Sequence, residues 1–186
     1  NKRAPVLVFL CALGTPARVY ARFARELTQL GINVCVPDWR GIGSSSVRVD
    51  RGVDFGYRHL LEIDHPALLA SVHQLYPESP IWLGGHSLGG QLSLLAASTA
   101  SIPIDGVLLI ASGTVHLPCY PIKLRASIRA VTLLARLSGT ALGYFPGNRL
   151  GFGGREARGV MADWGNVAHK GNYEVAGSTV NYEQTL

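Results

Sequence analysis

A serine between glycines is the residue of this chain best placed for chemistry, in the segment Gly85-His86-Ser87-Leu88-Gly89. The spacing G-x-S-x-G is typical of a tight turn from a strand into a helix, which holds the serine side chain above the edge of a sheet. An apolar stretch precedes the segment, and small and apolar residues of helical type follow it, as that turn requires. We therefore predict that Ser87 is a nucleophile that attacks a carbonyl carbon. The alternative is a chance turn in a chain with 22 glycines.

Attack on a carbonyl needs backbone N–H groups that stabilise the negative charge developing on its oxygen. The N–H of Leu88 is one predicted donor, because it opens the helix that follows the serine. A second donor is expected in the loop after the first apolar run, Cys11-Ala12-Leu13-Gly14. We predict that Leu13 supplies it and that Gly14 keeps the approach to the pocket open. The alternative is that Leu13 only lines the pocket.

The same chemistry needs a base that accepts the serine proton, usually a histidine held by a carboxylate. His86 is adjacent to Ser87, but neighbours on a tight turn point in different directions, so we expect it to be structural or to line the pocket. His116 follows a later predicted strand and is a second candidate for the pocket lining. Asp163 and His169 follow the serine in the order acid then base. They stand six residues apart on one predicted helix, and neither follows a strand, which argues against this pair.

Four apolar runs alternate with stretches of helical spacing, which predicts a parallel sheet with helices on its faces. The predicted strands are 5–11, 32–36, 80–83 and 106–111, the first two of them buried, and the predicted helices between them are 16–30, 56–76 and 91–100. Pro66 is expected to kink or divide the second helix, Gly31 to end the first, and residues 40–53 to form a loop. After Ser112 we predict a helix that follows Pro121, a Gly/Pro-rich loop over 143–154, a helix over 155–170 and a polar tail.

Three segments together resemble α/β-hydrolases of the serine aminopeptidase and monoacylglycerol-lipase type. They are Cys11-Ala12-Leu13-Gly14, Asp38-Trp39-Arg40-Gly41-Ile42-Gly43-Ser44-Ser45 and Gly85-His86-Ser87-Leu88-Gly89-Gly90. A fourth, Gly143 to Gly151, resembles a subgroup of predicted bacterial hydrolases whose substrate is not settled. The resemblance covers nearly the whole chain. It implies a mostly parallel sheet, a Ser-His-Asp triad, and structural roles for Asp38 and Arg40.

The family pattern differs from this chain at both ends. Family members begin with a strand pair before the run at Val6, and they end with two strands that carry the triad acid and histidine. We therefore expect an incomplete core, with the acid and the base beyond Leu186. The predicted organisation is a hydrolase core over 1–117, a helical cap over 118–170 and a tail over 171–186 that leads toward the rest of the core.

The net charge of +5 comes from one part of the chain, because residues 106–155 contain six Lys and Arg and no Asp or Glu. Arg125, Arg129 and Arg136 recur there at helical spacing and form a basic stripe. Such a stripe is either a solvated helix face or a surface for an anionic membrane or an acidic substrate. Nucleic acid is not expected as a partner, since no interleaved aromatic residues or nucleic-acid motif accompany the charge.

A globular chain of 186 residues with 47% hydrophobic residues is able to bury one core. Cys11, Cys35 and Cys119 form no C-x-x-C pair, so we expect reduced, mostly buried thiols, no metal and no cofactor. Neither a signal peptide nor a membrane-spanning run is visible, and a cytoplasmic location is expected. The predicted function is an esterase- or lipase-like serine hydrolase of a small acyl substrate, with lipid and anionic substrates as the candidates. Acyl transfer on the same fold and a non-catalytic binding protein are the alternatives.

Overall fold

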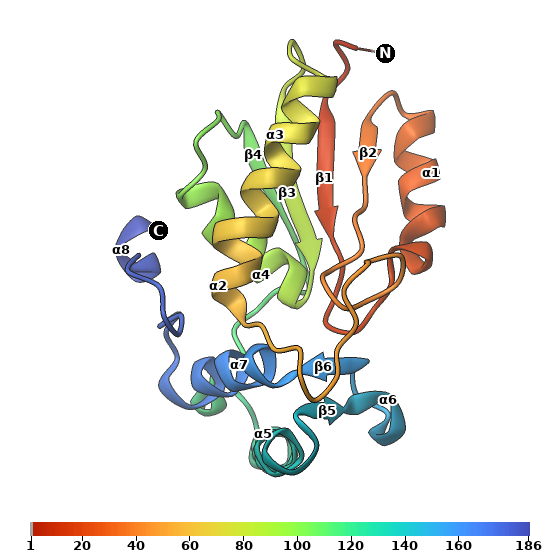
Figure 1. Cartoon of the computed structure of the whole chain (residues 1–186). Helices are drawn as coiled ribbons and strands as arrows, with labels where there is room; N and C mark the ends of the chain where they lie inside the picture. The colour runs from red at the N-terminus through yellow and green to blue at the C-terminus, as the bar shows by residue number, and fades with distance from the viewer. Residues whose placement is uncertain (1) are drawn as a thin grey trace.

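The computed structural model describes residues 2–186, and its centre is a sheet of four parallel strands (Figure 1). In the order β2-β1-β3-β4, the strands β1 (Val6–Leu10) and β3 (Ile81–His86) lie between β2 (Asn33–Cys35) and β4 (Gly106–Ile110). The predicted parallel sheet is therefore confirmed. Asn1, the first residue of the predicted core, lies outside the described residues.

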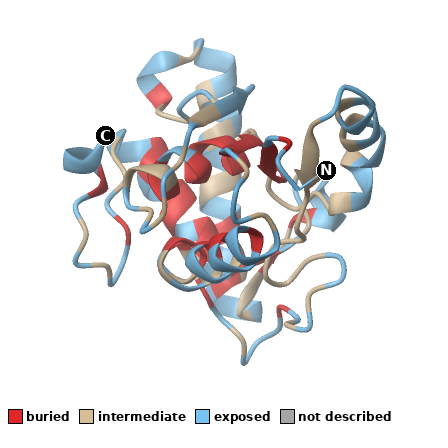
Figure 2. Ribbon diagram, turned by 90° about the horizontal axis from the view of Figure 1, so that it is seen from above, coloured by how far each residue is buried: buried red, intermediate tan, exposed pale blue. Residues whose placement is uncertain are grey.

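Helices cover both faces of the sheet, as expected for apolar runs without alternation. On one face, Phe9 of β1 stacks on Tyr20 of the 3-10 helix η1 (Ala17–Tyr20) and on Phe23 of α1 (Ala21–Gln29), with ring centroids 5.3 and 4.7 Å apart. On the other face, Val6, Val8 and Leu10 join the main core with residues of α3 (His65–Leu75) and α4 (Leu88–Ser98). Figure 2 shows that the buried residues gather in this central layer.

The edge strands are less buried than the central pair. The prediction of a buried strand over 32–36 is wrong in this respect: Asn33, Val34 and Cys35 are half-buried, because β2 has a neighbour on one side only. On β4, Leu108, Leu109 and Ile110 are 36–46% exposed.

Free thiols are found as expected, but Cys119 is exposed, so the expectation of mostly buried thiols holds for Cys11 and not for Cys119.

The long helical stretch after the loop is divided as predicted, but by a different device. It consists of α2 (Tyr57–His59), the π-helical segment η2 (Leu60–Asp64) and α3, without an interruption of the chain path. Pro66 lies in the first turn of α3, a position where the missing N–H of proline has no helical partner to lose. The change in helix type in η2, immediately before the proline, marks the division.

Residues 117–170 form a second layer below the carboxyl ends of the strands (Figure 1). It contains the 3-10 helix η3 (Leu117–Cys119), α5 (Ile122–Leu142), α6 (Gly147–Leu150) and α7 (Arg158–Lys170). The predicted loop over 143–154 is wrong in part: β5 (Tyr144–Pro146) pairs with β6 (Arg155–Ala157) in an antiparallel hairpin. The predicted helix over 155–170 accordingly starts at Arg158.

The tail forms no strand between residues 171 and 186, and it ends in the short helix α8 (Tyr182–Thr185). Tyr182 is 1% exposed, and the hydroxyl groups of Thr185 and Ser98 share a hydrogen bond of 2.8 Å, so the tail lies against α4. Within residues 2–186, no helix combines the length and the apolar character that crossing a membrane requires.

Candidate functional site

The turn that carries Ser87 joins β3 directly to α4. Strand β3 extends through His86, three residues further than predicted, and α4 starts at Leu88 rather than at Gln91. Between them Ser87 has φ 53° and ψ −122°, a conformation that L-residues rarely adopt. Within the described chain, the only other non-glycine residue with positive φ is Ala111. Strain of about 1–3 kcal/mol at such a residue persists only where the surroundings enforce it, and functional sites are where it clusters.

The flanking glycines are required by close approach of the backbone. A Cβ atom on Gly85 would lie 2.5 Å from the N atom of Gly90, and one on Gly89 would lie 2.5 Å from the carbonyl oxygen of Cys11. Real Cβ atoms do not approach backbone atoms so closely. The two glycines therefore let α4 start directly against the ends of β1 and β3, as the tight turn predicted from the G-x-S-x-G spacing requires.

Parallel pairing brings the loop after β1 to the same edge as the Ser87 turn. Leu10 of β1 pairs with Gly85 of β3, so residues 11–14 and the Ser87 turn leave the sheet side by side. Leu13, Gly14 and Leu88 line one small cavity of about 20 Å³, which has room for about one water molecule. The structure therefore brings these three predicted residues together around one cavity; Ser87, which directly precedes Leu88, is not among the residues that line it.

Free hydrogen-bonding groups remain at this edge. Neither the N–H of Leu13 nor that of Leu88 donates a hydrogen bond to another of residues 2–186. The hydroxyl of Ser87 has no side-chain or backbone partner within the same residues, and it does not cap α4. Two unpaired N–H groups, one of them at the positive end of a helix, form an arrangement that can accept a partial negative charge.

A match to a protein family agrees with this geometry. A family model described as the alpha/beta hydrolase fold matches residues 5–168. The chain belongs to the α/β-hydrolase family. The resemblance found in the three sequence segments is therefore confirmed for the family and its fold.

Solved structures with the same fold include two hydrolases. This α/β-hydrolase is 22% identical to the monoacylglycerol lipase of Paleococcus ferrophilus, with a TM-score of 0.50 over 74% of this chain and 48% of that one. A thermostable carboxyl esterase of Bacillus coagulans is 20% identical, with a TM-score of 0.57 over 76% of this chain and 43% of that one. At this identity the likeness establishes the fold alone.

A curated relative is more similar over a shorter stretch. A Pichia angusta protein named "Putative lipase ATG15" is 40% identical over 75 residues, which are 38% of this hydrolase chain and 13% of that protein. The chain thus spans less than half of the two solved structures and a small part of this relative.

His86 belongs to a chain of hydrogen bonds that includes Tyr20 and Ala12. Its Nδ1 shares a hydrogen bond of 2.9 Å with the hydroxyl of Tyr20, and the same hydroxyl accepts a bond of 3.0 Å from the N–H of Ala12. The structural role predicted for His86 agrees with these contacts. Tyr20, which falls in the predicted helix over 16–30, thus connects β3 to the loop of Leu13.

We predict that Tyr20→Phe destabilises the hydrolase by about 1–3 kcal/mol, because it leaves the Ala12 N–H and the His86 nitrogen without their partner. Urea unfolding measures the change. Tyr76→Phe is the control, since the hydroxyl of Tyr76 has no hydrogen bond within the described chain, and its effect should stay below about 0.5 kcal/mol. Equal effects of the two variants would show that the hydroxyl network contributes nothing.

Asp38 and Arg40 hold the loop after β2, as the family resemblance implies. Burial alone would raise the pKa of Asp38, but hydrogen bonds from the N–H of Ala17 and from the N–H and hydroxyl of Ser44 lower it. Arg40 forms an ion pair with Asp64 of η2. Both side chains therefore stabilise the loop, and neither contacts Ser87.

The other predicted polar residues are not gathered at Ser87. Asp163 is buried and accepts a hydrogen bond of 2.7 Å from the N–H of Tyr57, so it fixes the start of α2. Nε2 of His169 lies 3.4 Å from the hydroxyl of Thr132 on α5. His116 packs against Gly171, and it is not among the residues that line the Leu13–Leu88 cavity. The structure therefore gives no support to Asp163 and His169 as a catalytic pair.

One residue of this site was missed from the sequence. Glu156 of β6 is 4% exposed, lines the same cavity as Leu13 and Leu88, and accepts a hydrogen bond of 2.5 Å from the N–H of Gly154. A Cβ atom on Gly14 would lie 2.5 Å from Oε1 of Glu156, so the β5–β6 hairpin covers the loop directly. Burial raises the pKa of Glu156, and the bond from Gly154 opposes that rise.

This environment predicts a pH-dependent effect of Glu156→Gln, which keeps the acceptor oxygen and removes the charge. Because folding raises the pKa of Glu156, the protonated form of this residue favours the folded state. Its contribution to the free energy of unfolding is complete below the unfolded-state pKa and is lost as the pH rises through the folded-state pKa. The variant should match the natural protein near pH 4 and be more stable, by on the order of 1 kcal/mol, at about pH 8. Urea unfolding across this range measures the difference, and a pH-independent difference would contradict the assignment.

Proposed function

We propose that this α/β-hydrolase is an esterase- or lipase-like enzyme that cleaves an ester, thioester or amide through an acyl-enzyme on Ser87. The observation that carries the proposal is the strained turn, with φ of 53° at a serine placed between the end of β3 and the first residue of α4. A side chain with a free hydroxyl has little other reason to be held in this conformation.

The reaction would proceed in two steps. The oxygen of Ser87 attacks the carbonyl carbon while a histidine base takes its proton, and the carbonyl oxygen becomes an oxyanion. The N–H groups of Leu88 and Leu13 donate to that oxyanion. Collapse of the tetrahedral species expels the alcohol, thiol or amine, which takes the proton from the histidine. Water then attacks the acyl-enzyme in the same way and restores the serine.

The proposal requires a base and an acid from outside residues 2–186, because within them no histidine or carboxylate hydrogen-bonds to Ser87. The exposed leucines of β4 support this requirement. Leu108 and Leu109 are 36% and 46% exposed on a strand whose outer edge is unpaired within the described residues, so further strands would have a place to add there.

A fluorophosphonate probe tests the proposal, because it phosphonylates only a serine that is activated as a nucleophile. We expect intact-mass analysis of the protein together with the segments that supply the base and the acid to show one probe adduct, located by peptide mapping at Ser87 and absent from Ser87→Ala. Hydrolysis of short-chain p-nitrophenyl esters should be lost in the same variant. Labelling elsewhere, or ester hydrolysis that survives in Ser87→Ala, would refute it.

A second candidate is a binding protein that retains the hydrolase fold without catalysis. The observation in its favour is the same unpartnered Ser87 hydroxyl. The probe separates the two, because an inert pocket is not labelled. Acyl transfer to an alcohol or amine would differ from hydrolysis only in the second step, and product analysis with competing acceptors distinguishes these reactions.

A further inference from the structure

A large groove lies between α5 and α7, in the part of the chain predicted as the cap. Its volume is about 720 Å³, far larger than the cavity lined by Leu13 and Leu88, and the two share none of their lining residues. The opposite side of α7 packs into the core through Val160, Trp164 and Val167, so this helix separates the groove from the sheet. Figure 1 shows α7 between the sheet and α5.

The groove lies beside a face of α7 that carries small residues. Ala162 and Gly165 line it, and a Cβ atom on Gly165 would lie 3.6 Å from Cγ2 of Thr132, so the two helices are in contact there, whereas Gly159 faces Phe55. On the opposite wall, Arg129, Thr132, Arg136 and Thr140 share one face of α5. Of the basic stripe visible in the sequence, Arg129 and Arg136 therefore face a hollow, whereas Arg125 donates hydrogen bonds to the carbonyl oxygens of Tyr120 and Pro118.

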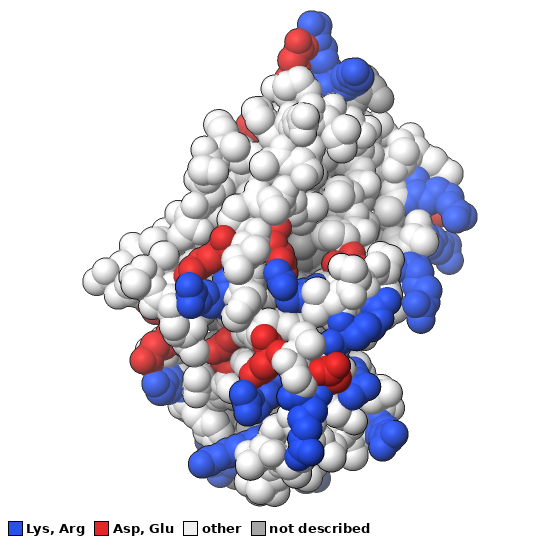
Figure 3. Space-filling view, viewed as in Figure 1, with Lys and Arg blue, Asp and Glu red and all other residues white. Residues whose placement is uncertain are grey.

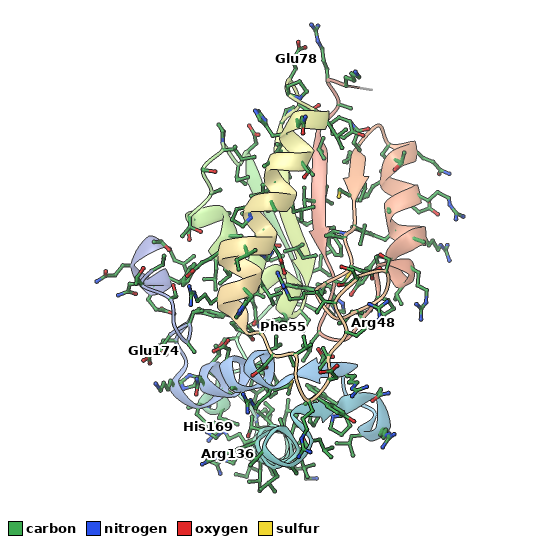
Figure 4. All side chains as sticks on the ribbon, in the orientation of Figure 1. Arg48, Phe55, Glu78, Arg136, His169 and Glu174 are labelled. Carbon is green, nitrogen blue, oxygen red and sulfur yellow. The ribbon has the colours of Figure 1, made fainter. Side chains whose placement is uncertain are left out.

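The charges in the groove are all positive. Neither Arg129 nor Arg136 has an ion pair or a side-chain hydrogen bond within the described residues, whereas Arg158 is paired with Asp54 at 3.0 Å. Asp54 does not line the groove, and no other acid does. Figure 4 labels Arg136 and His169, which extend from α5 and α7 in the lower part of the molecule, and Figure 3 shows basic and acidic side chains in this part, with the basic ones prevailing toward the bottom. Two unpaired guanidinium groups beside an imidazole suit a dianion, whereas the hydroxyls of Thr132 and Thr140 already donate to the carbonyl oxygens of Arg129 and Arg136.

Apolar walls complete the groove. Leu133 is 57% exposed beside it, and Met161 forms part of its floor. A simple inorganic ion would leave these walls in contact with water, whereas an organic group attached to the anion would cover them.

We propose that the α5–α7 groove binds a phosphate monoester attached to an apolar group, with Arg129 and Arg136 holding the phosphate. The groups of the groove match this ligand in charge, in hydrogen-bond donors and in the apolar wall beside them. This binding does not depend on acyl-enzyme chemistry at Ser87, which lies across α7.

Titration calorimetry of the full chain tests the proposal with two probes, hexyl phosphate in solution and phosphatidylcholine vesicles with or without phosphatidic acid. All measurements use the Ser87→Ala background, so that loss of the proposed activity cannot be confused with loss of binding. The groove variant is Arg129→Gln/Arg136→Gln. Its matched control is Lys123→Gln/Arg149→Gln, which removes the same charge outside the groove.

We expect the groove variant to raise the Kd for hexyl phosphate by about tenfold or more, and the control variant by less than about twofold. Binding of hexyl phosphate identifies a free phosphate monoester as a sufficient ligand. Groove-dependent binding to phosphatidic acid vesicles alone identifies a lipid-borne head group. No binding of either probe, or equal weakening by the two variants, would overturn the proposal, since the second result reflects net charge only.

Discussion

Replacing Ser87 by glycine is expected to lower the rate of ester hydrolysis by at least about 10⁴-fold while leaving the folded protein as stable as before or more stable. The loss of rate follows from removal of the attacking oxygen. The gain in stability follows from the backbone, because φ of 53° is strained for serine and ordinary for glycine. Relief of about 1–3 kcal/mol of strain, less about 0.5–1 kcal/mol for the added freedom of the unfolded chain, leaves a gain of roughly 0–2.5 kcal/mol.

Ala111→Gly is the matched control for this experiment. Ala111 is the second strained residue, with φ of 48°, and it follows β4 without contributing a functional group. We expect a comparable gain in urea-unfolding free energy and an unchanged rate of hydrolysis. A Ser87→Gly variant that is destabilised by more than about 1 kcal/mol would show that the serine side chain stabilises the turn, contrary to the strain interpretation.

The central part of the fold could be predicted because it depends on local composition. The run from Val6 to Leu10 has five apolar residues in a row, which only a strand covered on both faces can bury completely. The turn at Ser87 could be predicted for a similar reason: each glycine around it answers a steric need of that turn, so the spacing reports the backbone directly.

The ends of elements depended on contacts that sequence patterns do not contain. Gly84 and Gly85 have low strand propensity, yet they continue β3 because they pair with Phe9 and Leu10 of β1. Arg155, Glu156 and Ala157 are good helix formers in isolation, and pairing with β5 makes them a strand instead. In both cases the tertiary partner outweighs local preference.

The predicted site was incomplete for the same reason. Leu13, Gly14 and Leu88 follow from the position of their loops at the ends of neighbouring strands. The hydroxyl of Tyr20 meets His86 across 66 residues of sequence, and Glu156 reaches the Gly14 loop from a hairpin that was not predicted. Only coordinates reveal such pairs, because no spacing rule connects residues so far apart.

Gly89→Ala is expected to destabilise the protein by about 3 kcal/mol or more, a large effect for the addition of one methyl group. The added atom would overlap the carbonyl oxygens of Leu10 and Cys11, and these are backbone atoms at the end of the central strand that cannot turn aside as a side chain would. α4 would have to move away from β1. That movement would also carry the N–H of Leu88 away from the loop of Leu13, so the esterase rate should fall with the stability.

Gly113→Ala is the control, because a Cβ atom there meets nothing within 4 Å and the residue has no positive φ. We expect it to change the unfolding free energy by less than about 0.5 kcal/mol. If Gly89→Ala were equally harmless, α4 would not lie against the end of β1 as the structure has it. The Leu13 and Leu88 N–H groups would then lack the fixed spacing on which their proposed action on one oxyanion depends.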